Sequence, residues 1–76
     1  MEEILEILED ILPGAENLEN ETALIDGGVL NSFEIVELIS RLSDEFDIKI
    51  RSKYLIPENF NSVAAMWNMV QTILDE

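Results

Sequence analysis

Apolar side chains recur every three or four residues over the first part of the chain, which is the spacing of one face of a helix. They are Ile4, Leu5, Leu8, Ile11 and Leu12. Glu2 and Glu3 favour the N-terminus of this helix through its dipole, and Pro13-Gly14 follows its end. The pattern predicts a helix over about residues 2–12.

A second helical pattern begins at the pair Asn31-Ser32. Asn31 is a good N-cap, and Glu34 stands at the spacing that a capping box requires. The core-facing stripe of this helix consists of Ile35, Leu38, Ile39, Leu42 and Phe46. A second line, rotated away from that stripe, consists of Phe33, Val36 and Ser40. We expect this helix to end near residue 47.

Two further helical elements are predicted toward the C-terminus. Pro57 at a first-turn position, followed by Glu58, predicts a short helical turn over "PENF". Ser62 is placed to cap a last helix over about residues 63–75. The periodic apolar positions of that helix are Val63, Met66, Trp67, Val70, Ile73 and Leu74. A stripe of Trp and Met at this spacing is core far more often than a cofactor site.

The segments between these helices follow no helical period. "IKIRSK", residues 48–53, alternates as an extended segment, and it holds three of the four basic residues. The connection over residues 13–30 is long, and long loops in compact domains are often functional. We expect it to be held on the core by a set of apolar anchors: Leu18, Leu24, Ile25, Val29 and Leu30.

Together these patterns predict an all-α fold. It is a small four-helix bundle, with three main helices plus one short helix and a long loop after the first helix. The chain of 76 residues is expected to form a single domain over residues 1–76, because chains of this size bury only about 60% of their unfolded surface in one small core. Apolar residues make up 47% of the chain, which suits a globular fold and not a disordered acidic tail.

The charge balance is strongly acidic. The chain has 17 Asp and Glu against 4 Lys and Arg, a net charge of −13. This excess argues against nucleic acid and anionic membranes as partners, and it favours basic protein surfaces. The acidic N-terminus does not resemble a secretory signal, and no apolar run approaches the ~18 residues that span a bilayer. We expect a cytoplasmic monomer with no membrane insertion.

Most catalytic chemistry is excluded by residue type. Histidine and cysteine are both absent, which removes His-based acid–base catalysis, Cys and Ser triads, and most zinc sites. Gly27-Gly28 is not followed by the Lys-Ser/Thr pair of a P-loop, and the acidic connection lacks the ligand order of an EF-hand. We therefore expect no catalytic residues, no metal ligands and a protein that is not an enzyme.

Ser32 remains as the candidate for chemistry. Asn31 can cap the second helix, which leaves the Ser32 hydroxyl free to face solvent at the first helical position. Gly27 and Gly28 leave little side-chain bulk nearby, so a partner enzyme can approach closely. A phosphate ester on Ser32 would face the positive end of the helix. These features suit a residue that another enzyme modifies better than they suit a nucleophile.

The stretch "LIDGGVLNSFEIVELI", residues 24–39, resembles the attachment motif of acyl and peptidyl carrier proteins. Asp26 stands for the acid of that motif, Gly27-Gly28 for its turn, and Asn31-Ser32-Phe33 for its central triplet. The likeness continues through "VELISRLSDEFDIKI" and "IPENFNSV", and it covers about residues 24–70. The resemblance implies the fold of an acyl carrier protein and assigns the cofactor-binding residues Ser32, Asn31, Asp26, Gly27 and Gly28.

The resemblance also implies a cofactor and partners. Ser32 would receive 4′-phosphopantetheine from coenzyme A through a phosphopantetheinyl transferase. The thiol of that arm would hold an acyl or aminoacyl thioester, which agrees with a chain that has no cysteine of its own. An adenylating acyl or aminoacyl ligase would load the cargo, and an acyltransferase or synthase with a basic docking surface would receive it.

The partner-docking residues carried over from the family are Phe33, Glu34, Val36, Glu37 and Asp44. Phe33 and Val36 lie off the predicted core stripe, which supports this assignment independently of the resemblance. Exposed apolar residues with acids around them would meet an apolar and basic partner surface. The alternative is that Phe33 covers the loop and the acids form an ordinary solvated face.

Two questions stay open at the level of sequence. The family usually has Asp before the serine, where it is thought to help hold the metal during cofactor transfer, whereas this chain has Asn31. That departure leaves a second hypothesis, an unmodified acidic protein-interaction module derived from a carrier. Phe33 and the "FDI" that follows resemble the D-alanyl carrier protein of lipoteichoic acid modification, but the motif does not specify cargo or pathway.

The charge excess leads to a prediction about stability. Self-repulsion at a net charge of −13 should weaken the native state at low salt. Added salt shortens the Debye length to about 10 Å at 0.1 M, so the melting temperature should rise with ionic strength. Calorimetric melting over a salt series measures this effect. A melting temperature that does not change from low to moderate salt would reject the repulsion argument.

Overall fold

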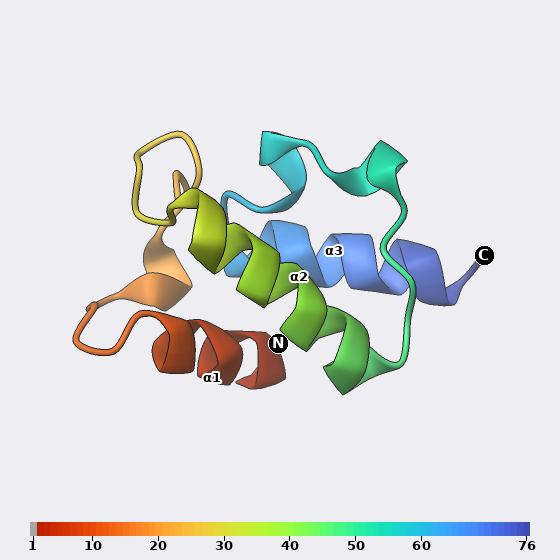
Figure 1. Cartoon of the computed structure of the whole chain (residues 1–76), viewed down its shortest axis with the longest axis horizontal. Coiled ribbons are helices and arrows are strands. Elements are labelled where there is room, and N and C mark those ends of the chain that lie inside the picture. Colours follow the sequence, from red (N-terminus) through yellow and green to blue (C-terminus); the bar gives the residue numbers. More distant parts are fainter. Residues whose placement is uncertain (1) are drawn as a thin grey trace.

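The computed structural model describes residues 2–76, and over that range it is all-helical (Figure 1). The three α-helices are α1 (Glu2–Ile11), α2 (Ser32–Phe46) and α3 (Val63–Leu74). The three short 3-10 helices are η1 (Leu18–Asn20), η2 (Ser52–Tyr54) and η3 (Pro57–Asn59). In Figure 1, α2 crosses in front of α3, and α1 lies along the lower edge of the molecule.

The all-α prediction is confirmed, and its three main helices are present. The predicted helix over residues 2–12 ends one residue earlier, at Ile11, and the last helix ends at Leu74 rather than 75. The predicted short helix over "PENF" exists only as the three-residue 3-10 helix η3, so a bundle of four α-helices is not confirmed. η1 and η2 were not predicted, because three-residue elements are too short to show a period.

Local signals define both ends of α2. The Asn31 side chain accepts a hydrogen bond from the Glu34 N–H at 2.8 Å, and the Glu34 carboxylate accepts one from the Asn31 N–H at 2.8 Å. This is the predicted capping box, which satisfies two backbone donors at the helix start. Asp47 ends the helix in the left-handed region, at φ 52°, and the Ile48 N–H then bonds back to the Ser43 carbonyl at 3.1 Å.

Fourteen hydrophobic residues are buried among residues 2–76, and they come from the three α-helices, η1, the connection before α2 and the residue after η3. They are Ile4, Ile7, Leu8, Ile11, Leu18, Leu24, Leu30, Leu38, Leu42, Phe60, Val63, Met66, Met69 and Val70. Three of the five predicted loop anchors, Leu18, Leu24 and Leu30, are therefore in the core, and the other two are partly buried against it.

The predicted helix stripes need three corrections. Ile7 and Met69 are buried at 4% and 3% exposure although neither was assigned to a core stripe. α1 contacts both α2 and α3, so its buried face is wider than one stripe, and α3 likewise meets α1, η1 and η3. Leu74 was predicted to be core but is 56% exposed, because it lies in the last turn of α3, at the end of the molecule (Figure 1).

Two side-chain contacts tie α2 to the other helices. The Arg41 guanidinium pairs with the Asp10 carboxylate of α1 at 3.0 Å. On the α3 side, the Phe46 and Trp67 rings lie 5.9 Å apart at an interplanar angle of 54°. Trp67 thus packs against the core, as predicted for the Trp and Met stripe. Within residues 2–76, no helix has both the length and the apolar character to cross a membrane.

The division of α2 into a buried and an exposed side leads to a prediction. Leu42 is fully buried, so Leu42→Ala should lower the free energy of unfolding by about 2–5 kcal/mol. Val36 lies on the same helix at 67% exposure, and Val36→Ala should change the free energy of unfolding by less than about 0.5 kcal/mol. Urea denaturation followed by circular dichroism measures both values. Equal losses from the two variants would contradict this arrangement of α2.

Candidate functional site

Ser32 is the first residue of α2, and its side chain is exposed. The helix begins where the loop at the left of Figure 1 ends, so Ser32 sits at the tip of a rigid element next to an irregular segment. Within residues 2–76, the backbone N–H groups of Ser32 and Phe33 donate no hydrogen bond. The predicted placement is confirmed: an exposed hydroxyl stands beside unpaired donors at the positive end of a helix.

The two glycines shape the loop for different reasons. The Gly27 N–H bonds to the Ala23 carbonyl at 2.6 Å, and a Cβ at Gly27 would lie only 2.6 Å from that same oxygen. Gly27 is therefore required by close backbone approach. Gly28 has open space around it but a φ of +73°, which residues with a Cβ rarely adopt. The loop closes when the Leu30 N–H bonds to the Leu24 carbonyl at 3.0 Å.

Asn61 is a site residue that sequence reasoning missed. Its Oδ1 accepts hydrogen bonds from the Ile25 N–H at 2.9 Å and the Asp26 N–H at 3.1 Å. Its Nδ2 donates to Asp26 Oδ2 at 3.0 Å, and its backbone carbonyl accepts from the Leu24 N–H at 3.0 Å. Asn61 immediately precedes the N-cap of α3, so one residue connects the loop before Ser32 to another part of the fold. No local pattern links residues 35 positions apart.

The predicted docking residues fall into three environments. Phe33 and Val36 are 88% and 67% exposed, the largest values among the large hydrophobic side chains of residues 2–76. Glu37 and Asp44 are exposed acids on the same helix. Glu34 is only half-buried, and its carboxylate already serves the capping box. The structure thus brings the set together along α2 but gives Glu34 a structural bond of its own.

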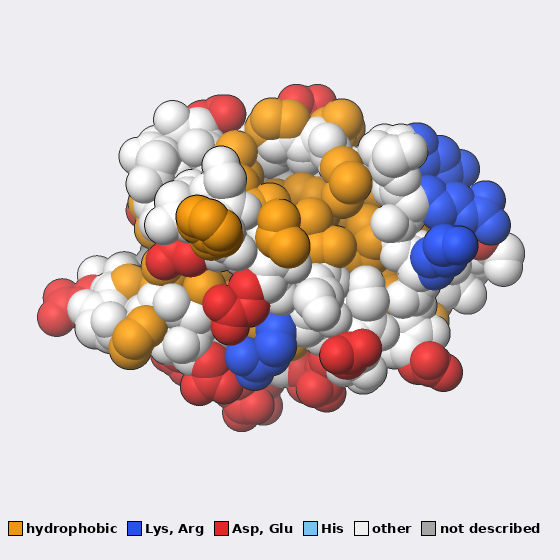
Figure 2. All heavy atoms as spheres, viewed as in Figure 1, with side chains coloured by type: hydrophobic (Ala, Val, Ile, Leu, Met, Phe, Trp, Pro, Cys, Tyr) orange, Lys and Arg blue, Asp and Glu red, His pale blue; other side chains and the backbone are white. Residues whose placement is uncertain are grey.

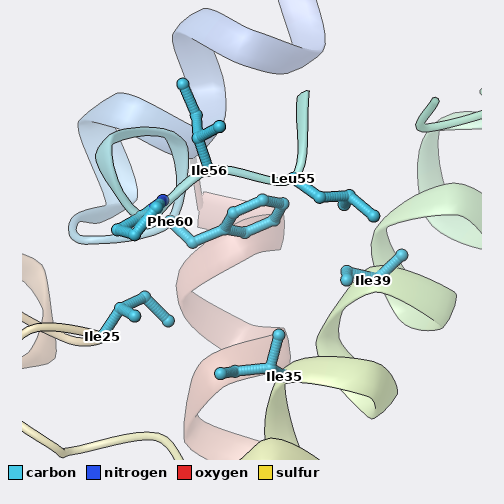
Figure 3. A pocket seen from close by; sticks show the side chains of 7 residues that line it. Ile25, Ile35, Ile39, Leu55, Ile56 and Phe60 are labelled. Atoms are coloured by element: carbon cyan, nitrogen blue, oxygen red, sulfur yellow. The ribbon is translucent and has the colours of Figure 1, made fainter. Parts of the chain in front are cut away.

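A pocket of about 150 Å³ opens beside α2 (Figure 3). Its lining is entirely hydrophobic and consists of Ile25, Ile35, Ile39, Leu55, Ile56, Pro57 and Phe60. In Figure 3, Ile35 and Ile39 point from α2 toward Phe60 and Leu55 on the segment that precedes α3. Figure 2 shows the same region as a hollow with hydrophobic side chains around it. The pocket can exclude water from a small apolar group, but its side chains offer no partner to a charge.

A separate polar cluster lies near the end of α3. The Tyr54 hydroxyl donates a hydrogen bond to the Glu76 carboxylate, and Lys53 Nζ lies 3.5 Å from Glu76 Oε2. The hydrogen bond from Tyr54 holds the pKa of Glu76 below its usual value, and the same bond raises the pKa of Tyr54. In Figure 2 the basic side chains of this region gather at the right, away from the end of the molecule that holds the loop before α2 in Figure 1.

The described part of the chain contains no group of three or more His, Cys, Asp or Glu side chains arranged to hold a metal ion.

Comparison with known proteins assigns the family. A family model described as "Phosphopantetheine attachment site" matches residues 2–70. The chain therefore belongs to the family of carrier proteins that hold a phosphopantetheine attachment site. Carrier proteins of this family bind 4′-phosphopantetheine covalently, and they work with phosphopantetheinyl transferases and with synthetic or ligase enzymes.

A curated relative gives a more specific likeness. The chain is 42% identical to "Aminoacyl carrier protein 2" of Bradyrhizobium diazoefficiens over 50 residues. The match covers 66% of this chain and 55% of the relative, so the chain spans about half the length of the curated relative that it matches. No solved structure matches this chain.

The residues around Ser32 fit the cofactor of the family. A phosphodiester needs an accessible hydroxyl and benefits from nearby unpaired N–H donors, and α2 supplies both at its first turn. Gly27 and Gly28 place no side chain over the loop. The all-hydrophobic pocket lies on the same helix, starting one turn beyond Ser32 at Ile35.

The capping geometry predicts a difference between two substitutions at Asn31. Asn31→Ala removes the acceptor for the Glu34 N–H and should lower the free energy of unfolding by about 1 kcal/mol. Asn31→Asp keeps an acceptor and places a negative charge at the positive end of α2, so it should retain most of the stability. Denaturant unfolding of the three proteins compares them. A loss from Asn31→Asp as large as that from Asn31→Ala would contradict the capping box.

Proposed function

We propose that Ser32 is the residue that carries 4′-phosphopantetheine, and that the chain is an acyl or aminoacyl carrier protein. The observation that supports this best is the position of Ser32: it is exposed, it begins α2, and it stands beside unpaired backbone donors. The family match over residues 2–70 includes this segment. In this assignment η3 takes the place of the short helix of a four-helix carrier bundle.

In the proposed role, the chain is a substrate for a series of enzymes rather than a catalyst. The cofactor supplies the thiol that this sequence lacks, and the cargo is held on it as a thioester. Asn31 keeps the start of α2 fixed through its cap, and the first-turn N–H groups face the phosphodiester on Ser32. Asp26 and the two glycines form the turn that leaves Ser32 accessible.

An aminoacyl cargo is the best supported class, because the curated relative is named an aminoacyl carrier protein. The pocket agrees with this choice in one respect: its hydrophobic lining cannot pair an ammonium group, so an aminoacyl cargo would remain in solvent, ready for a partner enzyme. D-alanine is one such cargo, suggested by the resemblance to D-alanyl carriers. A short apolar acyl group is the alternative, and it would be the cargo that the pocket accepts.

We propose that partners dock on the outer face of α2. Phe33 and Val36 would form the apolar centre of the contact, and Glu37 and Asp44 would attract basic residues around it. The partners would be a phosphopantetheinyl transferase, an adenylating acyl or aminoacyl ligase, and an acyltransferase or synthase with a basic surface. Glu34 would contribute mainly through the cap.

The proposal predicts a covalent modification. Incubation with coenzyme A, magnesium and a broad-specificity transferase should add one phosphopantetheine to the chain, as measured by intact mass. Ser32→Ala should abolish the gain and keep the helical content, because the Ser32 side chain takes no part in the core. Ser52 is an exposed serine on η2, and Ser52→Ala is the matched control. This variant should be modified like the wild type.

The opposite outcome has a definite meaning. If several transferases that modify a known carrier add nothing to the wild-type chain, the chain is an unmodified acidic interaction module. The presence of Asn31 before the serine is the sequence feature that would explain this result.

A further inference from the structure

We propose that Asn61 is the positioning residue of the loop over residues 24–30, and that its side chain sets how Ser32 is presented to modifying and loading enzymes. The inference rests on the proposed function of Ser32 and assigns a role to a residue outside the attachment motif. It follows from a set of hydrogen bonds that converge on one amide from a segment 35 positions away.

Asn61 is well placed to act as a fixed point. Phe60 before it and Val63 two residues after it are 3% and 2% exposed, and both belong to the core. The backbone of Asn61 is therefore held on both sides, and its short side chain has little freedom to lose when it bonds. A group anchored in this way can impose its geometry on the loop that bonds to it.

The loop depends on this amide for its own hydrogen bonds. The N–H groups of Ile25 and Asp26 both donate to Asn61 Oδ1, at 2.9 and 3.1 Å, and within residues 2–76 they have no second acceptor. Asn61 Nδ2 donates to Asp26 Oδ2 at 3.0 Å, which fixes the direction of the one carboxylate in the turn. An amide side chain supplies an acceptor for two N–H groups and a donor for a carboxylate at once.

The restraint reaches Ser32 through a short path. The Leu24 N–H bonds to the Asn61 carbonyl, and the Leu24 carbonyl accepts from the Leu30 N–H, each at 3.0 Å. These backbone bonds fix the two ends of the loop. Between them, the Asn61 side chain acts beside the backbone bonds that the Gly27 and Gly28 N–H groups donate to the Ala23 and Ile25 carbonyls. Without that side chain, other loop arrangements would compete with the one that leaves Ser32 accessible. The apparent affinity for a partner is then the intrinsic affinity multiplied by the fraction of molecules whose loop has the competent arrangement.

The first experiment measures transferase kinetics with the carrier chain as the substrate. Asn61→Ala should raise KM by about fivefold to tenfold and leave kcat nearly unchanged, because the transferase restores the loop once bound. Amide hydrogen exchange should show faster exchange at Ile25 and Asp26 in the variant. Ser62→Ala is the control: it removes the adjacent cap of α3 at a cost of about 1 kcal/mol but keeps every bond of the Asn61 side chain. It should leave KM unchanged.

The second experiment uses Asn61→Asp, which keeps the shape of the side chain and replaces the Nδ2 donor with a carboxylate oxygen. At pH 8 its charge would face Asp26 at hydrogen-bond distance, so KM should rise at least as much as in Asn61→Ala. As pH falls toward 5, one proton shared by the two carboxyl groups restores a donor, and the ratio of variant to wild-type KM should decrease. The ratio for Asn61→Ala should not change with pH.

The outcomes separate this inference from the proposed function. If the wild type is modified and Asn61→Ala shows wild-type KM and wild-type exchange, the positioning role is wrong while Ser32 remains the attachment residue. If Ser62→Ala raises KM as much as Asn61→Ala, the effect is one of stability and the positioning role is again wrong. If the wild type is never modified, the exchange of Ile25 and Asp26 still decides whether Asn61 orders the loop.

Discussion

The packing of the connection between α1 and α2 onto the core is the constraint on which the rest of the structure depends. Three short helices leave part of a small core uncovered, and Leu18, Leu24 and Leu30 of the connection fill that gap. Because these residues are buried, the two ends of the irregular segment before Ser32 are fixed on the core. The proposed attachment site thus follows a loop whose ends belong to the core.

α2 combines two roles that are usually separated. Its inner side supplies Leu38 and Leu42 to the core, while Phe33 and Val36 face solvent on the other side. A small domain that exposes two large hydrophobic residues on one helix incurs a solubility cost, and a net charge of −13 offsets it. The same charge attracts basic surfaces, as the proposed docking of partners on α2 requires.

In this carrier family the reactive thiol belongs to the covalently bound cofactor and not to the polypeptide. The sequence of this chain has no cysteine and no histidine. What the fold supplies is presentation: a capped helix start, a turn with little bulk, and an apolar pocket on the same helix. Under the proposed function, specificity depends on which enzymes dock and which cargo they attach.

The sequence by itself determined the features that depend on near neighbours along the chain. Helix ends, the capping box at Asn31 and the exposed position of Ser32 all follow from contacts within about one helical turn, so a linear pattern can show them. Only the tertiary structure decided the role of Asn61, the burial of Ile7 and Met69, and the pocket between α2 and the segment before α3. Each of these depends on groups far apart in sequence meeting in space, and such meetings leave no period or motif in the chain.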